Sequence, residues 1–214
     1  YYVIKNVFEK VMGAFKESNA YVEALNLADI TLGKNAEGAK AYAEQVERLA
    51  GINQVEWLTN LGTMNQMFTG FGVGADQAAH MSQQLTQLAY DIQSAYNAAD
   101  LTEVMRRLQS GITGEVEGMR RYGVDLTNAS MKEYLHARGI ETKVSALSQA
   151  QKAMVRYNMI MESTSNIQGD LARTIATPAN ALRILSNQVS IASRYFGQLV
   201  SVIATAVIPI MQAV

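Results

Sequence analysis

The 214-residue sequence contains no cysteine, only two prolines and few charged residues, which make up 17% of the chain. The lack of cysteine excludes disulfides, thiol nucleophiles and cysteine-ligated metals. Eighteen Lys and Arg against 19 Asp and Glu leave a formal charge of −1. We therefore expect no sequence-specific nucleic-acid binding, because that function favours a basic surface. The chain begins with Tyr1 and shows no secretory signal pattern, so we expect it to be part of a longer protein.

Scarce proline and abundant Ala, Leu, Met, Gln and Glu favour helix along nearly the whole chain. No alternating apolar and polar run is bounded by turn residues, so we expect no sheet. The prediction is an all-α fold: short capped helices followed by a long hydrophobic C-terminal helix, in a symmetric oligomer. The predicted helices, with a candidate break near Ser18 and a candidate restart at Pro178, are 1–32, 35–50, 53–68, 75–98, 100–110, 113–122, 127–138, 148–166 and 169–214.

Glycine followed by an apolar β-branched residue marks the predicted helix ends, since glycine readily takes the left-handed conformation there. These glycines are Gly51, Gly72, Gly111, Gly123 and Gly139. Polar side chains that accept hydrogen bonds from the first helical N–H groups mark the predicted starts. These starts are Asn35, Asp100, Thr113, Ser148 and Thr177, which precedes Pro178.

Three glycines, Gly70, Gly72 and Gly74, lie close together and form the best candidate hinge. We predict three segments around it: an N-terminal helical segment at 1–72, a central helical region at 73–166 and a long apolar helix at 167–214.

The C-terminal helix carries an apolar seam with alternating spacings of three and four residues, as in a heptad repeat. The seam, a candidate oligomer contact, consists of Leu182, Leu185, Val189, Ala192, Phe196, Leu199, Ile203, Ala206 and Ile210. No charged residue lies between Tyr195 and Val214, a length near the roughly 20 residues that span a bilayer. Three interpretations stay open: burial in its own domain or against copies of itself, self-assembly through the seam, and conditional membrane insertion.

Residues with catalytic or ligand-binding potential are few. His80 and His136 each follow an acid by about one helical turn, Asp76 and Glu133, but no third metal ligand lies nearby. The glycines at 70, 72 and 74 lack the strand and Gly-Lys-Ser/Thr ending of a phosphate loop. Glu115 and Glu117 would point to different helix faces. We predict no catalytic, cofactor or metal site.

One pair of short motifs resembles an enzyme family. Glu17-Ser18 and the later Ala95-Tyr96-Asn97-Ala98 are similar to signatures of lytic transglycosylases, which use one Glu as general acid and base. The family's Gly-Leu-Met-Gln element is missing.

Read in order, the chain resembles the central helical region of phage tail tape measure proteins. The resemblance covers roughly residues 20–200 and rests on segments 81–92 (MSQQLTQLAYDI), 106–115 (RRLQSGITGE), 119–127 (MRRYGVDLT), 147–158 (LSQAQKAMVRYN), 168–174 (QGDLART) and 180–183 (NALR). It implies a structural protein extended inside the tail tube whose length sets tail length. In some phages the hydrophobic part is thought to help the genome cross the host membrane.

The resemblance and the residue patterns together favour a non-enzymatic structural and delivery role in the virion. The expected partners are copies of the chain itself, with a trimer favoured, the tail tube and tail-tip or baseplate hub proteins, and the host membrane during ejection. Two alternatives stay open: a helical pore former that inserts into membranes, and a lytic transglycosylase-like wall-degrading module.

Overall fold

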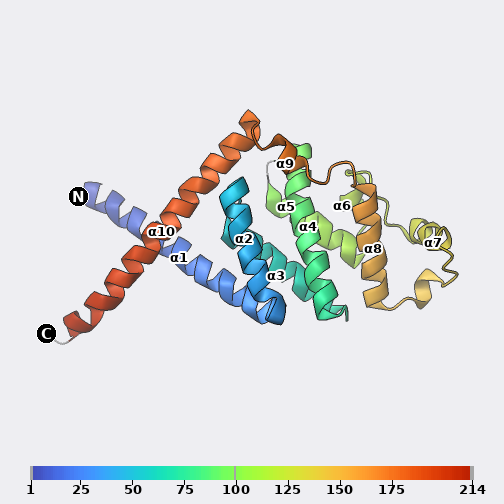
Figure 1. Ribbon diagram of the computed structural model, residues 1–214, viewed down its shortest axis with the longest axis horizontal. Coiled ribbons are helices and arrows are strands. Elements are labelled where there is room, and N and C mark those ends of the chain that lie inside the picture. Colours follow the sequence, from blue (N-terminus) through green and yellow to red (C-terminus); the bar gives the residue numbers. More distant parts are fainter. Residues whose placement is uncertain (1, 99, 213–214) are drawn as a thin grey trace. The chain divides into compact units, whose positions relative to one another are not determined.

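The computed structural model describes residues 2–98 and 100–212, with the side chains of all of these except 2–4, 6–8, 178–180, 183 and 203–212. These residues form helices and turns and no strand, which confirms the predicted all-α class (Figure 1). The α-helices are α1 (Tyr2–Leu32), α2 (Ala36–Ala50), α3 (Gln54–Gly70), α4 (Ala75–Ala95), α5 (Leu101–Thr113), α6 (Glu117–Arg120), α7 (Asn128–His136), α8 (Gln149–Ser163), α9 (Asp170–Thr174) and α10 (Pro178–Gln212); the 3₁₀ turns are η1 (Gly33–Asn35) and η2 (Val144–Ala146).

The chain folds as two compact units. Unit 1 comprises residues 1–59 and 181–214, and unit 2 comprises residues 60–180. Contacts in space, rather than position along the chain, define these units. The three segments expected from the sequence, 1–72, 73–166 and 167–214, divide the chain by sequence position. They therefore remain a prediction that these two units do not test.

In unit 1, α1 and α2 pack through alanines. Ala24 and Ala28 of α1 and Ala39 and Ala43 of α2 are all buried, and such small side chains let two helix backbones approach closely. The break expected near Ser18 does not occur, because Ser18 is buried in the middle of a continuous α1. A single serine reduces helix propensity by only a fraction of a kcal/mol, roughly 0.5, which packing easily offsets.

In unit 2, the core is built around α4. Its side chains Met81, Leu85, Leu88 and Ile92 repeat at helical spacing and are all buried. Helices α5 and α9 pack on α4, while α8 contacts both α5 and α7. This arrangement buries the apolar side of α4.

The predicted helix ends are largely confirmed. Gly51, Gly72, Gly123 and Gly139 all take positive φ angles, as the left-handed end requires. Gly111 is the exception, because it lies inside α5, which ends at Thr113 and is capped by Gly114 instead. A Cβ atom at Gly111 would lie 2.6 Å from Cγ of Met119. Close packing, rather than helix termination, therefore explains this glycine.

Some of the predicted helix starts are confirmed and others are not. The Asp100 carboxylate accepts a hydrogen bond from the N–H of Thr102 at 2.8 Å, and Ser148 forms a complete capping box with Gln151. Asn35 precedes α2 but its side chain makes no capping bond. Thr113 was wrongly expected to start a helix: it ends α5, and the next helix begins at Glu117.

Candidate functional site

The apolar seam of α10 faces away from the rest of unit 1. The exposed fractions of its side chains range from 50% to 69% at Leu182, Leu185, Val189, Phe196 and Leu199, and Ala192 is exposed as well. The side chains of the remaining seam residues, Ile203, Ala206 and Ile210, lie outside the described part of the chain. The seam residues that are described therefore form an uncovered apolar surface.

The opposite side of α10 carries a buried ion pair. The Arg194 guanidinium donates hydrogen bonds to both carboxylate oxygens of Glu47 in α2, at 2.8 and 2.7 Å. Only 2% of the Arg194 side chain and 6% of the Glu47 side chain are exposed. Glu47 also accepts a hydrogen bond from the N–H of Gln54 at 2.9 Å. Two-point pairing of this kind fixes the orientation of both side chains.

Aromatic rings complete the surroundings of Arg194. Its guanidinium carbon lies 4.6 Å from the centre of the Tyr21 ring in α1 and 5.0 Å from that of Tyr195, within the range of cation–π attraction. Burial disfavours the charged guanidinium, but the Glu47 carboxylate outweighs burial and raises the pKa of Arg194. The Arg194 charge is therefore stabilised in the interior of unit 1.

Helices α1 and α10 cross at a glycine (Figure 1). A Cβ atom at Gly197 would lie 1.8 Å from the carbonyl oxygen of Ala14, which is closer than any side chain allows. Seven residues earlier, the Ser190 hydroxyl donates to the Glu17 carboxylate at 2.9 Å. The side of α10 that packs inward thus combines small and polar residues with the buried apolar side chain of Ile191.

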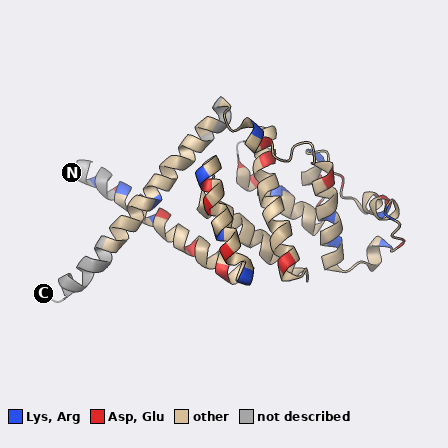
Figure 2. Ribbon diagram, in the orientation of Figure 1, with Lys and Arg blue, Asp and Glu red and all other residues tan. Residues whose placement is uncertain are grey.

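Helix α10 therefore carries apolar residues on both sides: Ile191 packs inward together with Arg194 and Gly197, and the apolar seam faces outward. Figure 2 shows how sparse charge is along this helix, whose sequence holds only Arg183 and Arg194. Amphipathic helices of globular proteins normally bury the apolar face. Among the residues described, no helix has both the length and the apolar character needed to cross a membrane.

The three glycines predicted as a hinge lie in the connection between α3 and α4. Only Gly72 has a positive φ, at 87°, and the next residue, Val73, is buried and donates its N–H to the carbonyl of Phe68 at 3.0 Å. This geometry is the glycine helix end that the sequence predicted. Motion at Gly70, Gly72 and Gly74 remains a prediction.

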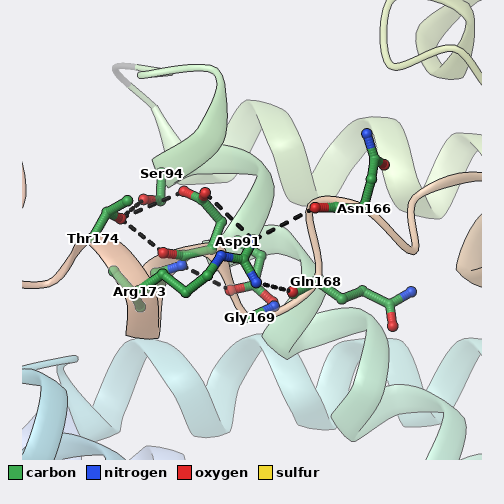
Figure 3. A network of polar contacts seen from close by, with 9 residues as sticks. Asp91, Ser94, Asn166, Gln168, Gly169, Arg173 and Thr174 are labelled. Atoms are coloured by element: carbon green, nitrogen blue, oxygen red, sulfur yellow. Dashed lines mark hydrogen bonds and ion pairs between the residues drawn. The ribbon is translucent and has the colours of Figure 1, made fainter.

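In unit 2, the carboxylate of Asp91 holds the segment around α9 against α4 (Figure 3). Asp91 is only 1% exposed. One of its oxygens accepts a hydrogen bond from the N–H of Gly169 at 2.9 Å, and the other accepts one from Leu171 at 3.1 Å. Burial raises the pKa of Asp91, and these two N–H donors oppose that shift.

Neighbouring contacts reinforce the attachment of α9. The hydroxyls of Ser94 in α4 and Thr174 in α9 lie 2.7 Å apart, and Arg173 donates to the carbonyl of Gln168 at 2.8 Å (Figure 3). Every group in this network is engaged with a backbone or side-chain partner of the same unit. The network therefore joins two helices, and it has the geometry of a structural contact.

The residues considered for catalysis or metal binding lie in separate structural contexts. His80 and Asp76 are both exposed on α4. His136 lies 3.2 Å from the carboxylate of Glu141. Among the described residues, no group of three or more His, Cys, Asp or Glu side chains could hold a metal ion.

The two motifs that resemble lytic transglycosylases take part in helix contacts. Glu17 accepts the hydrogen bond from Ser190 described above. Asn97 has a positive φ of 46° just after the end of α4, and the Tyr96 ring lies 5.2 Å from that of Tyr122. Both motifs therefore take part in the local packing of the helices.

Three buried charged residues, Asp91, Glu47 and Arg194, were not predicted from the sequence. For Asp91 the signal was available, since an acid stands between Tyr90 and Ile92 in an otherwise apolar stretch of α4. For Glu47 and Arg194 it was weaker, because the two residues lie 147 positions apart.

Comparison with protein-family models, with curated proteins and with solved structures finds no match for this chain.

Proposed function

We propose that this chain is a segment of a phage tail tape measure protein that assembles with copies of itself through the outward apolar seam of α10. In this role it is a non-enzymatic structural component of the tail tube or tip. It takes part in tail assembly and length control and in genome delivery across the host membrane. The proposal depends most on one observation: the large apolar side chains of the described seam are half or more exposed, while the opposite side of α10 is buried.

Burial of the seam would supply the free energy of assembly. Removing a large apolar side chain from water is worth about 1.5–3 kcal/mol when burial is complete. Leu182, Leu185, Val189, Phe196 and Leu199 are half or more exposed, so each keeps much of that free energy available. A continuous uncovered stripe of this kind marks a contact surface, whereas scattered exposed apolar residues do not.

A second copy of the same helix is the occupant that the seam fits best. Alternating spacings of three and four place the seam along one side of α10, which suits knobs-into-holes packing against identical helices. The seam contains no charged residue, so copies placed side by side would not repel each other there. We propose a trimer around the tail axis, with tail tube and tail-tip or baseplate hub proteins as further partners.

The direct test of self-assembly is the mass of the chain in solution. Native mass spectrometry and sedimentation should give a trimer for the unmodified chain and a monomer for the double variant Leu185→Asp with Leu199→Asp. The matched control is Leu49→Asp, since Leu49 is 72% exposed on α2, outside the seam. A monomer at the highest soluble concentration, or equal loss of assembly in the control, would overturn the proposed contact.

A second experiment tests the place of the chain in the tail. Cryo-electron microscopy of intact tails should show copies of α10 around the tail axis with the seam at their mutual contact. Leakage from liposomes caused by the isolated chain, without any association with tails, would instead favour the membrane-inserting alternative.

A further inference from the structure

Unit 2 has an open surface cavity of about 690 Å³, lined mostly by exposed residues, between α7, the connection through η2 and the first half of α8. Asn128, Lys132 and His136 line it from one side of α7, because residues four apart share a helix face. The connection contributes residues 140–145, and α8 contributes Lys152. Volumes of roughly 300–1,000 Å³ are typical of sites for small molecules.

The charges around this cavity are unbalanced. Lys132, Lys143 and Lys152 line it, and the one acid in the lining, Glu141, already pairs with His136 at 3.2 Å. None of the three ammonium groups has an ion-pair partner within the described part of the chain. Lys40 shows the usual alternative, since it contacts Asp29 at 2.6 Å and Glu37 at 3.1 Å.

The three lysines outnumber the single acid around this concavity and repel each other, and an anion between them would reduce that repulsion. Counting Glu141 against the three lysines, the lining has a formal charge of +2 when His136 is neutral. The amide of Asn128 and the hydroxyls of Thr142 and Ser145 add hydrogen-bond donors to the lining. Lysine ammonium groups are compact charges that commonly bind phosphate.

We propose that this cavity binds a small molecule bearing a phosphate group with two or more negative charges. A phosphomonoester or pyrophosphate matches the charge of the lining, whereas a single carboxylate would leave it positive. The shape of the site favours a small ligand over a nucleic-acid duplex, because duplex binding needs an extended basic surface and the whole chain has a formal charge of −1. This inference concerns unit 2 and does not depend on the function proposed for α10.

The first test is calorimetric titration of the full chain with sodium pyrophosphate at constant ionic strength. We expect saturable binding of one ligand per chain. Lys132→Ala and Lys143→Ala should each weaken binding about tenfold or more, because a hydrogen bond to a charged group is worth about 1.5–3 kcal/mol. The matched control is Lys16→Ala, an exposed lysine of α1 in unit 1, which should leave the affinity unchanged.

The proposed phosphate site is contradicted if pyrophosphate shows no saturable binding. It is also contradicted if Lys16→Ala weakens pyrophosphate binding as much as Lys132→Ala does. Lys143 lies on the exposed connection, so its replacement should leave the thermal unfolding of the chain unchanged and tests the site without disturbing the fold. Retention of full affinity in Lys143→Ala and Lys132→Ala together would also overturn the assignment.

A second titration distinguishes the sources of the phosphate group. A dinucleotide with a 5′-phosphate is compared with the same dinucleotide ending in a 5′-hydroxyl. Tighter binding of the phosphorylated form than of pyrophosphate would identify a nucleotide-type phosphomonoester, and tighter binding of pyrophosphate would identify a simple phosphate. Binding of long duplex DNA without either small ligand would contradict the proposal and indicate an extended surface instead.

Discussion

Helices α4 and α10 carry similar apolar patterns but use them in opposite ways. In α4, the apolar side chains Met81, Leu85 and Leu88 are buried within unit 2. In α10, the corresponding pattern at Leu182 and Leu185 is exposed, while the side that carries Ile191 and Arg194 packs within unit 1. Apolar periodicity predicts which side chains share a helix face, but it does not predict which face the fold covers.

The two helices also differ in how the fold compensates a buried charge. Arg194 of α10 depends on one side chain, Glu47, whereas Asp91 of α4 accepts hydrogen bonds from two backbone N–H groups. A side-chain pair is lost when either partner is replaced. Backbone donors stay in place whatever the sequence, so the acid in α4 depends less on other side chains, of which Gln87 gives it one further hydrogen bond.

The largest effect that we expect comes from Glu47→Gln. The substitution leaves the Arg194 charge buried without a counter-ion, and breaking a buried pair in this way costs about 3–5 kcal/mol. Hydrogen exchange should show loss of protection in α10, and thermal unfolding of unit 1 should occur at lower temperature.

Two further variants give this prediction its controls. Glu44→Gln removes an exposed pair with Arg48, whose atoms lie 2.9 Å apart, and should cost about 0.5 kcal/mol or less. Replacing both Glu47 and Arg194 by Met should recover most of the stability, because no unpaired charge remains. Equal destabilisation by Glu47→Gln and Glu44→Gln would mean that the buried pair does not hold α10.

A smaller effect is expected from Asp91→Ala in unit 2. It leaves the N–H groups of Gly169 and Leu171 without their acceptor, which costs about 1–3 kcal/mol for each buried group left unsatisfied. Hydrogen exchange at residues 169–174 should become faster, and Asp91→Asn should have a smaller effect because its amide oxygen still accepts one bond. The control is Glu133→Gln, a change at an exposed acid of α7, which should leave hydrogen exchange at residues 169–174 unchanged. Unchanged hydrogen exchange in Asp91→Ala would contradict the role of Asp91 in holding α9 against α4.

The smallest predicted effect concerns pH and the contact between α7 and α8. Glu162 accepts hydrogen bonds from the Tyr134 hydroxyl at 2.7 Å and from Arg138 at 2.7 and 2.5 Å. The Tyr134 bond, followed by Arg138, lowers the pKa of Glu162 below its ordinary value of 4.5. Burial and the Glu162 carboxylate raise the pKa of Tyr134 to about 12.

The sign of this pH effect follows from the lowered pKa of Glu162. The stabilisation is complete above pH 4.5, the ordinary value for the group, and is lost as the pH falls through the lower pKa of the folded state. At neutral pH, Glu162→Gln should therefore speed hydrogen exchange in α7 slightly, and this difference should disappear in strong acid. A difference that grows on acidification would show that the contact does not depend on the ionised carboxylate.

Local signals in the sequence predicted much of the fold. Asp100, Ser148 and Pro178 mark helix starts as expected, because capping is decided by residues within one helical turn. Gly111 shows the limit of such signals, since its neighbour Met119 comes from the following helix. A glycine required for close packing and a glycine required for a helix end look alike in sequence.

The candidate sites were predicted less completely than the fold. The α10 seam was visible in the sequence as an apolar repeat, but its exposure was not. Lys132, Lys143 and Lys152 are spread over 20 positions of an ordinary mixed-charge stretch, so nothing in the sequence showed that they line one cavity. Their convergence depends on how α7 and α8 pack.

The sequence by itself determined the helical class, most helix boundaries and the residues that share each helix face, because these properties arise from interactions within a few positions of the chain. Only the tertiary structure decided that α10 turns Arg194 inward toward Glu47 and its seam outward, and that Asp91 meets the backbone at Gly169. The physical reason is that burial and ion pairing depend on contacts between distant segments, which local patterns do not encode.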